Sequence, residues 1–375
     1  MMSSHHSGGR SLLPLANRIV WLGGAGAVAV LLTLSAVVAQ AVAPARDGQA
    51  RASAPASGRT RPAGGSHDPG PVRTAAKVTP LVRRVRAVVL RQRAPIARRD
   101  FGGRAPAAPT VLLSRSDPAR GWAFGSSVLT PPQGVKAPPD ASLFIAHHAK
   151  TGWDVAVTGS RSFTEYARRA PDSVVPKAER SLLAAYGKAA ASKDTGLSLP
   201  WKAGESWTMR ATGSAEEIAF TGGDGRVLAA GPGRLYRLCS REAGRGMLLL
   251  IHPNGLASTY SQMSALTKAE DGAAVQRGAF LGTAGNTDSC TGAHASGPPA
   301  VVFGLLSGGR PVSLNALLIG GWTLRLPASG PIQAEGQGAR IQAGDPMRNL
   351  GPAPAASSSP KQSPTARTPS AAAAS

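Results

Sequence analysis

The sequence predicts a mainly β protein, whose C-terminal domain is a curved antiparallel β-sheet preceded by a small α+β module, an N-terminal transmembrane helix and disordered segments. Three observations support this prediction. From residue 199 onward, short apolar runs alternate with glycine-containing turns, a pattern typical of β-hairpins. An uncharged apolar stretch of 27 residues lies between Arg18 and Arg46, and about 20 such residues cross a bilayer as a helix. Residues 46–104 and 351–375 are rich in Ala, Pro, Ser or Gly, which bury too little apolar surface to fold.

The N-terminal part is interpreted as a cytoplasmic tail (1–18), a transmembrane anchor (19–43) and a disordered basic linker (44–108). A signal peptide cleaved after Ala41 is the alternative, but the apolar run exceeds the ~7–15 residues of a signal sequence. The positive-inside rule favours a cytoplasmic position for segments rich in arginine, so the arginines after the anchor do not favour an extracytoplasmic linker. The extracytoplasmic placement of the linker and of the domain after it therefore rests on the nature of the C-terminal domain. Residues 81–93 mix Val and Leu with arginine, and either contact an anionic membrane or are solvated.

The charge of the chain is uneven. Its 375 residues carry a formal net charge of +22, from 42 Lys and Arg against 20 Asp and Glu. Half of this excess, +11, lies in residues 46–104. No zinc finger, helix-turn-helix or RNA-binding aromatic signature accompanies it, which argues against a nucleic-acid partner. Two cysteines exclude a disulfide-rich scaffold. The charge therefore suits a tether near the anionic surface of a cell envelope.

Residues 109–195 are expected to form the small α+β module. A strand at 122–129 ends before two prolines, and the turn Lys150-Thr151-Gly152 joins two further strands into a hairpin. Two segments of helical character follow, the second beginning near Pro176. The strands of the hairpin are expected at 142–149 and 153–159, and the helices at 163–170 and 175–191.

Residues 199–327 are expected to form the all-β domain. The dipeptide Asn254-Gly255 tolerates the positive φ of a tight hairpin turn, and glycines at regular offsets let a small sheet curve strongly. Such a sheet can hold a groove on one face for an extended peptide. The expected strands are 226–230, 234–239, 247–252, 256–261, 279–283, 301–306, 311–314 and 321–326.

Three sequence patterns occur in order within this domain. They are Gly223-Asp-Gly-Arg-Val-Leu-Ala-Ala230, Leu250-Ile-His-Pro-Asn-Gly255 running into Ser258-Thr-Tyr260, and a series of glycines from Gly272 to Gly285 followed by Val302-Phe-Gly304. Together they resemble the lysostaphin-type (LytM-like) zinc endopeptidases, which cleave peptidoglycan cross-bridges. The closing Ile319-Gly-Gly-Trp322 resembles the staphylolytic-protease branch of that family. The resemblance covers about 199–326.

This resemblance implies a zinc ion with an open position, which polarises the scissile carbonyl and activates water. It implies ligands from a His and an Asp in one motif and from the second His of a His-x-His strand. The first His of that strand and a His after the mid-domain Tyr would assist. In this sequence the Asp position falls at Ala219, and 207–214 contains no His. The mid-domain position is Gln262, and the His-x-His strand reads Ala300-Val-Val302.

The zinc ligands and catalytic histidines are therefore replaced under this alignment, and neither Ala nor Val coordinates a metal. An alternative register aligns His294 with one family His but leaves Ser296 at the next ligand. Glu216, Glu217 or His252 would have to rebuild a metal site, and surface glutamates with a packed histidine are the simpler interpretation. We expect no cofactor, and a drier groove that binds a peptide or a partner. The residues expected at this groove are Ala219, Tyr260, Gln262, Ala300, Val302, His252 and His294.

Cys239 and Cys290 both lie in the resembling region. If the domain is outside the membrane, we expect a disulfide between them, and two free thiols are the alternative.

The leading hypothesis is a single-pass cell-membrane protein with an extracytoplasmic, catalytically inactive peptidase-like domain. Its expected partners are peptidoglycan or a cell-wall protein such as a wall hydrolase, and the membrane through the N-terminal helix. One alternative is an active zinc-dependent peptidoglycan endopeptidase with non-standard ligands. Another is an anionic-polymer binder that acts through the basic linker.

Overall fold

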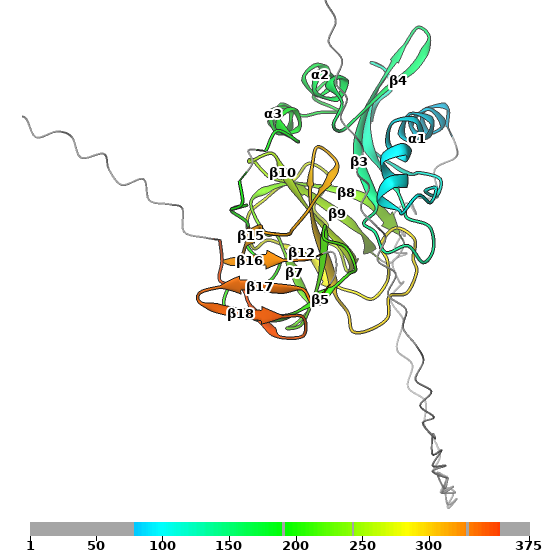
Figure 1. The fold of residues 1–375 in the computed structure, drawn as a ribbon. Coiled ribbons are helices and arrows are strands. Elements are labelled where there is room, and N and C mark those ends of the chain that lie inside the picture. The colour runs from blue at the N-terminus through cyan, green and yellow to red at the C-terminus, as the bar shows by residue number, and fades with distance from the viewer. Residues whose placement is uncertain (1–78, 190–191, 242–243, 328–329, 353–375) are drawn as a thin grey trace, which may run out of the picture. The chain divides into compact units, whose positions relative to one another are not determined.

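The computed structural model describes residues 79–352, apart from 190–191, 242–243 and 328–329. The expected cytoplasmic tail, the anchor at 19–43, much of the basic linker and nearly all of the C-terminal tail lie outside the described residues. Among the helices of the described part, none combines the length and the apolarity needed to cross a membrane. The described residues form mainly antiparallel β-structure with three helices (Figure 1). This confirms the predicted mainly β class.

A helix begins the described part of the chain: α1, Pro80–Asp100. The Thr79 side chain accepts a hydrogen bond from the backbone N of Val82 (3.2 Å), and Pro80 takes a position where no N–H is needed. One side of α1 is buried in a core shared with strands, through Leu81, Val82, Val85, Val88 and Val89. The prediction of a disordered linker up to residue 108 is therefore wrong for this segment, because its apolar residues recur at helical spacing between the arginines.

A four-stranded antiparallel sheet packs against α1, in the order β1-β2-β3-β4 (Figure 1). Its strands are β1 (Thr110–Asp117), β2 (Trp122–Leu129), β3 (Asp140–Ala149) and β4 (Gly152–Val157). Two helices follow, α2 (Arg161–Arg169) and α3 (Lys177–Ala185). The predicted hairpin and both predicted helices are present, the second helix being shorter than expected. β1 is a further strand that the sequence analysis does not predict separately.

The largest sheet contains eleven strands, with the path β11-β8-β9-β10-β13-β6-β5-β19, and β7, β12 and β14 attached beside it. Its strand pairs are antiparallel. The strands are β5 (Ser206–Ala211), β6 (Glu217–Thr221), β7 (Arg226–Leu228), β8 (Gly233–Arg241), β9 (Arg245–Ile251), β10 (Leu256–Ser264), β11 (Ala274–Val275), β12 (Phe280–Ala284), β13 (Val301–Ser307), β14 (Arg310–Val312) and β19 (Pro346–Arg348).

The β-structure continues past the predicted boundary at residue 327. A second four-stranded sheet contains β15 (Leu318–Ile319), β16 (Trp322–Arg325), β17 (Gln333–Gly336) and β18 (Ala339–Gln342). The chain then returns to the large sheet, where β19 pairs with β5 and Met347 is the register partner of Trp207. The indole nitrogen of Trp322 donates to the backbone oxygen of Arg348 (2.7 Å). The domain therefore extends to about residue 350.

Two hydrophobic cores lie against the large sheet. One joins strands of the large sheet to β15–β18, and includes Trp207, Phe220, Phe303, Trp322 and Leu324. The other joins β2, β3, α2 and α3 to β8 and β9, and includes Phe124, Leu183, Tyr236, Leu249 and Cys290. The second core packs the α+β module directly onto the β-domain.

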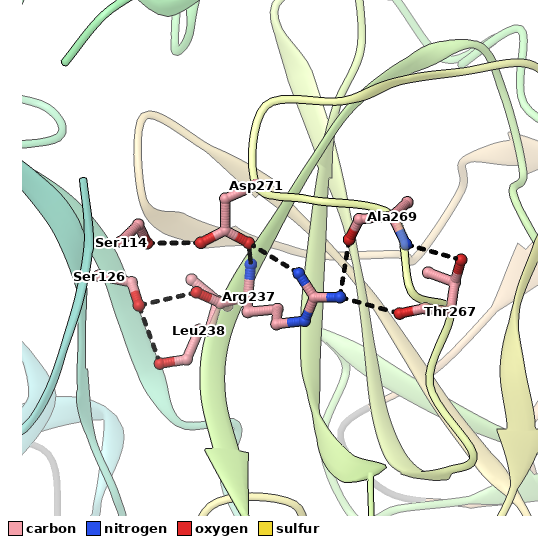
Figure 2. Close-up of polar contacts among 7 residues, drawn as sticks. All are labelled: Ser114, Ser126, Arg237, Leu238, Thr267, Ala269 and Asp271. Atoms are coloured by element: carbon pink, nitrogen blue, oxygen red, sulfur yellow. Dashed lines mark hydrogen bonds and ion pairs between the residues drawn. The ribbon is translucent and has the colours of Figure 1, made fainter. Parts of the chain in front are cut away.

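Polar contacts also fix β1 and β2 to β8 and to the loop 265–273 (Figure 2). Ser126 donates to the backbone oxygens of Arg237 (2.8 Å) and Leu238 (3.0 Å). The Asp271 carboxylate accepts from the Ser114 hydroxyl, from the backbone N of Arg237 (2.9 Å) and from Arg237 Nη1 (3.3 Å). These bonds and the shared core make the modules predicted at 109–195 and 199–327 one packed unit.

Candidate functional site

Four neighbouring strands of the large sheet bring the expected site positions together. The register across β5, β6, β13 and β10 places Arg210 opposite Ala219, Ala219 opposite Val302, and Val302 opposite Ser261. The next row on the same face pairs Glu217 with Gly304. Opposed residues of antiparallel strands point to the same face. We call this surface the site face and define it as Arg210, Glu217, Ala219, Ser261, Val302 and Gly304.

The opposite face of these strands is core. Residues that alternate with the site face are buried in the first hydrophobic core: Met209, Ile218, Phe220, Tyr260, Val301 and Phe303. The sequence of β6 shows the same alternation. Residues 217, 219 and 221 are polar or small, and residues 218 and 220 are apolar. Arg210, Glu217 and Ala219 stay partly exposed, so solvent reaches the site face over β5 and β6.

The structure corrects two of the expected groove residues. Tyr260 is fully buried in the core, where its hydroxyl accepts from the backbone N of Ala230 (2.9 Å) and lies 2.9 Å from Ser258 Oγ. His252 belongs to the same network: Nδ1 lies 2.8 Å from the backbone oxygen of Pro232, and Nε2 lies 2.8 Å from Ser258 Oγ. Because a carbonyl only accepts, Nδ1 carries the proton and Nε2 accepts from Ser258. Burial lowers the pKa of His252 to about 4, so this packed histidine is neutral.

The other expected positions adjoin the site face. Gln262 follows Ser261 at an irregularity of β10, has a positive φ (58°), and donates its backbone N–H to Ser289 Oγ (2.8 Å). Ala300 pairs with Gly285 through two backbone hydrogen bonds (2.7 and 3.2 Å). A Cβ placed on Gly285 would lie 2.6 Å from the backbone oxygen of Gln262, so these three residues are close neighbours. Ala219, Gln262, Ala300 and Val302 therefore surround one region of the sheet.

The loop between β12 and β13, residues 285–300, borders this region and is tied down by the disulfide Cys239–Cys290 (Cα–Cα 5.5 Å). This bond confirms the predicted pairing. The Asp288 carboxylate holds the loop from inside by accepting from the backbone N of Cys290 (3.1 Å) and of Thr291 (2.6 Å). His294 is exposed in this loop and forms a bridge with Thr287, so it does not lie in the row of Ala219 and Val302.

Two charged side chains of the site face lack an internal partner. Within the described residues, neither the guanidinium of Arg210 nor the carboxylate of Glu217 makes a hydrogen bond or an ion pair with another side chain or with the backbone. Burial raises the pKa of Glu217 to about 8, and the nearby carboxylates Asp288 and Glu216 add to the effect. In the sequence analysis, Glu217 is named only as a possible metal ligand, and Arg210 is not identified as a site residue. The alternation of polar and apolar residues along 206–211 is the signal that places Arg210 on this face.

The donor set does not fit a zinc ion. Zinc needs about three protein ligands that carry nitrogen, sulfur or oxygen donors. The positions expected to hold it, Ala219 and Val302, end in methyl groups. In the part of the chain that the structure describes, no three His, Cys, Asp or Glu residues gather closely enough to hold a metal. Two hollows, of about 430 and 480 Å³, lie elsewhere on the molecule, beside Trp201 and Leu182 respectively.

Comparison with known proteins gives a family match over the same strands. Residues 214–314 match the model of Peptidase family M23. No curated protein matches. Among solved structures, the M23 metalloprotease pseudoalterin from the deep sea is 27% identical, with 40% of this chain and 97% of that chain covered and a TM-score of 0.34. The catalytic domain of lysostaphin from Staphylococcus simulans is 21% identical over 30% of this chain and 77% of that chain, with a TM-score of 0.21. A putative peptidase M23 from Pseudomonas aeruginosa is 17% identical over 55% and 82%, with a TM-score of 0.25.

Proposed function

We propose, for a chain that carries a Peptidase family M23 domain over residues 214–314, that the site face binds cell-wall peptide and does not hydrolyse it. The proposed partner is peptidoglycan, or a wall hydrolase that acts on it. One observation carries this proposal. Ala219 and Val302 are register partners at the positions where the family resemblance expects zinc ligands, and neither side chain has a donor atom.

The chemistry of the site face supports binding. Ala219, which is partly exposed, and its register partner Val302 form a floor of small or apolar groups, against which an extended peptide backbone can lie closely. The hydroxyl of Ser261 and the carboxyl of Glu217 adjoin this floor and can hydrogen-bond to such a backbone. No residue on the face supplies a Lewis acid, so a bound carbonyl is oriented without being polarised by a metal.

The placement in the cell is part of the proposal. The disulfide Cys239–Cys290 supports an oxidising compartment, since such bonds are rare in the cytosol. The uncharged stretch between Arg18 and Arg46 supports a membrane anchor ahead of the domain. We therefore propose a single-pass cell-membrane protein with an extracytoplasmic peptidase-like domain.

The test uses the purified full chain and purified peptidoglycan sacculi. Sedimentation with the sacculi measures binding, and the release of soluble fragments measures hydrolysis, with zinc added and with a chelator added. We expect saturable co-sedimentation and no release above the blank. Absence of co-sedimentation would overturn the binding, and release that zinc supports and the chelator abolishes would show an active endopeptidase.

A charge control separates this proposal from binding through the basic linker. The control chain has its basic residues between 44 and 78 replaced by Gln: Arg46, Arg51, Arg59, Arg61, Arg73 and Lys77. Contacts made by this segment are electrostatic and weaken with salt, whereas the site face is unchanged in the control. We expect the control to keep saturable binding at moderate salt. Loss of all binding in the control would favour an anionic-polymer binder instead.

A further inference from the structure

Arg210, like Arg86, lacks the internal partners that other buried and partly buried arginines of the described structure have. Arg93 makes a two-bond ion pair with Asp140 (2.9 and 2.8 Å), and Arg115 makes one with Glu179 (2.8 and 2.9 Å). Arg237 is bonded to Asp271 and to two backbone oxygens. Arg210 is also partly buried, yet its guanidinium has no hydrogen-bonding or ionic partner within the described residues.

The Arg210 guanidinium lies against Gly297. A Cβ placed on Gly297 would lie 2.9 Å from Arg210 Nη2 and 3.0 Å from Nη1, so the guanidinium reaches from β5 to the loop before β13. Gly297 has a φ of +103°, which favours glycine there. The loop that carries Gly297 is held by Cys239–Cys290 and by the bond from Thr221 Oγ1 to the backbone oxygen of Pro299 (2.6 Å). Arg210 is also the register partner of Ala219, so its side chain leaves β5 beside that residue.

An unpartnered guanidinium in this position has a clear chemical preference. Its five N–H donors form a planar fork that matches a carboxylate with two parallel hydrogen bonds. None of the Arg210 nitrogens is among the buried unpaired atoms, so water reaches these donors, and a bound carboxylate would replace that water with charge-assisted hydrogen bonds. The surrounding floor of Ala219 and Val302 accommodates the chain to which the carboxylate belongs.

We propose that Arg210 is the carboxylate-binding residue of the site face, and that the ligand is a short peptide with a free carboxylate. This inference rests on the proposed function, and it names the chemical group by which the peptide is recognised. The carboxylate lies on the guanidinium between β5 and the loop, and the peptide backbone extends over β6 and β13 toward Glu217.

The experiment uses the full chain and two fluorescent synthetic peptides. The first is Ala-Glu-Lys-Ala with a free C-terminus, which carries two carboxylates. The second is Ala-Gln-Lys-Ala amide, in which both carboxylates are replaced by neutral amides. We expect the first peptide to bind and the second to bind about tenfold more weakly or worse, as for the loss of a charge-assisted hydrogen bond. Equal binding of the two peptides, or no binding of the first, would overturn the inference.

Substitutions of single arginines test whether Arg210 is the residue that binds the peptide carboxylate. Arg210→Gln should weaken binding of the first peptide about tenfold or more, and Arg210→Lys should weaken it less because the charge remains. Arg161→Gln is the matched control, since Arg161 is 93% exposed on α2 and removal of its charge leaves the site face intact. If Arg161→Gln weakens binding as much as Arg210→Gln, the peptide responds to overall charge and the inference fails.

Thermal unfolding of the variants excludes a merely structural role. Arg210 has no internal partner to lose, so Arg210→Gln should unfold at the same temperature as the native chain or higher. A clear fall in unfolding temperature together with unchanged peptide binding would assign Arg210 a structural role. Failure of this inference is distinguishable from failure of the proposed function, because sacculus co-sedimentation by Arg210→Gln and by the native chain is measured separately.

Discussion

Ala219 on β6 and Val302 on β13 are direct register partners on the site face. Directly opposed side chains on neighbouring strands have Cβ atoms about 5 Å apart, a distance suited to two ligands of one metal ion. At this pair of positions the chain presents two aliphatic groups, and neither has a donor atom for a metal. Because neither side chain can bind zinc, this pairing of Ala219 with Val302 supports the proposal that the site face binds peptide without hydrolysing it.

The disulfide should make a large contribution to stability. Cys239→Ser combined with Cys290→Ser removes a cross-link between positions 51 residues apart, and the chain-entropy relation gives a loss of about 4 kcal/mol in the free energy of unfolding. Denaturant titration of the native chain and of the double variant, under oxidising and non-oxidising conditions, measures this loss in the free energy of unfolding. The native chain under reducing conditions should match the double variant, and an unchanged midpoint would contradict the assigned role.

The buried pair Arg93–Asp140 should hold α1 to the rest of the fold. Both side chains are nearly fully buried, and Arg93 also donates to the backbone oxygen of Gly309. Arg93→Ala leaves Asp140 buried without its partner, which costs about 3–5 kcal/mol of unfolding free energy. Arg91→Ala on the exposed side of the same helix is the control, and we expect a change within about 0.5 kcal/mol. Equal effects of the two substitutions would mean that α1 is not anchored through Arg93.

Sequence patterns predicted most of the β-domain because its strands alternate clearly and its turns contain glycine. They missed α1, since five arginines between 80 and 93 mask an apolar stripe made of residues such as Val85 and Val89. They also missed β17 and β18, which are short and largely polar. The error over Tyr260 arose because a motif gives the position of a residue along a strand, whereas the burial of Ile218 and Phe303 beside it decides which face is core.

His252 should make the protein less stable in acid. Its pKa is about 4 in the folded state, against 6.5 for an ordinary histidine side chain. The unfolded chain therefore binds more protons between these values, and the free energy of unfolding falls as the pH is lowered from 6.5 to 4, by roughly 3 kcal/mol. His252→Gln should lack this part of the pH dependence, whereas the exposed His294→Gln should keep it. Chemical denaturation over this pH range measures the slopes, and parallel slopes for native and His252→Gln would contradict the packed, neutral histidine.

Glu217 should make the protein less stable at high pH, whereas His252 makes it less stable in acid. Its folded pKa of about 8 lies above the ordinary glutamate value of 4.5. Its contribution to stability is therefore complete below pH 4.5 and is lost as the pH rises through 8. We expect Glu217→Gln to be more stable than the native chain at pH 9, with a difference that shrinks toward pH 4. Glu165→Gln, at an exposed position on α2, serves as a control in the same titration. A Glu217→Gln curve parallel to that of the native chain would refute the raised pKa.

Metal analysis of the purified full chain tests the central claim most directly. The chain is incubated with excess zinc chloride, dialysed against metal-free buffer and assayed for zinc by mass spectrometry, beside a lysostaphin-type zinc peptidase treated in the same way. Because Ala219 and Val302 offer no donor atoms, we predict no stoichiometric zinc in this chain and retained zinc in the reference enzyme. One tightly bound zinc per chain would contradict the account.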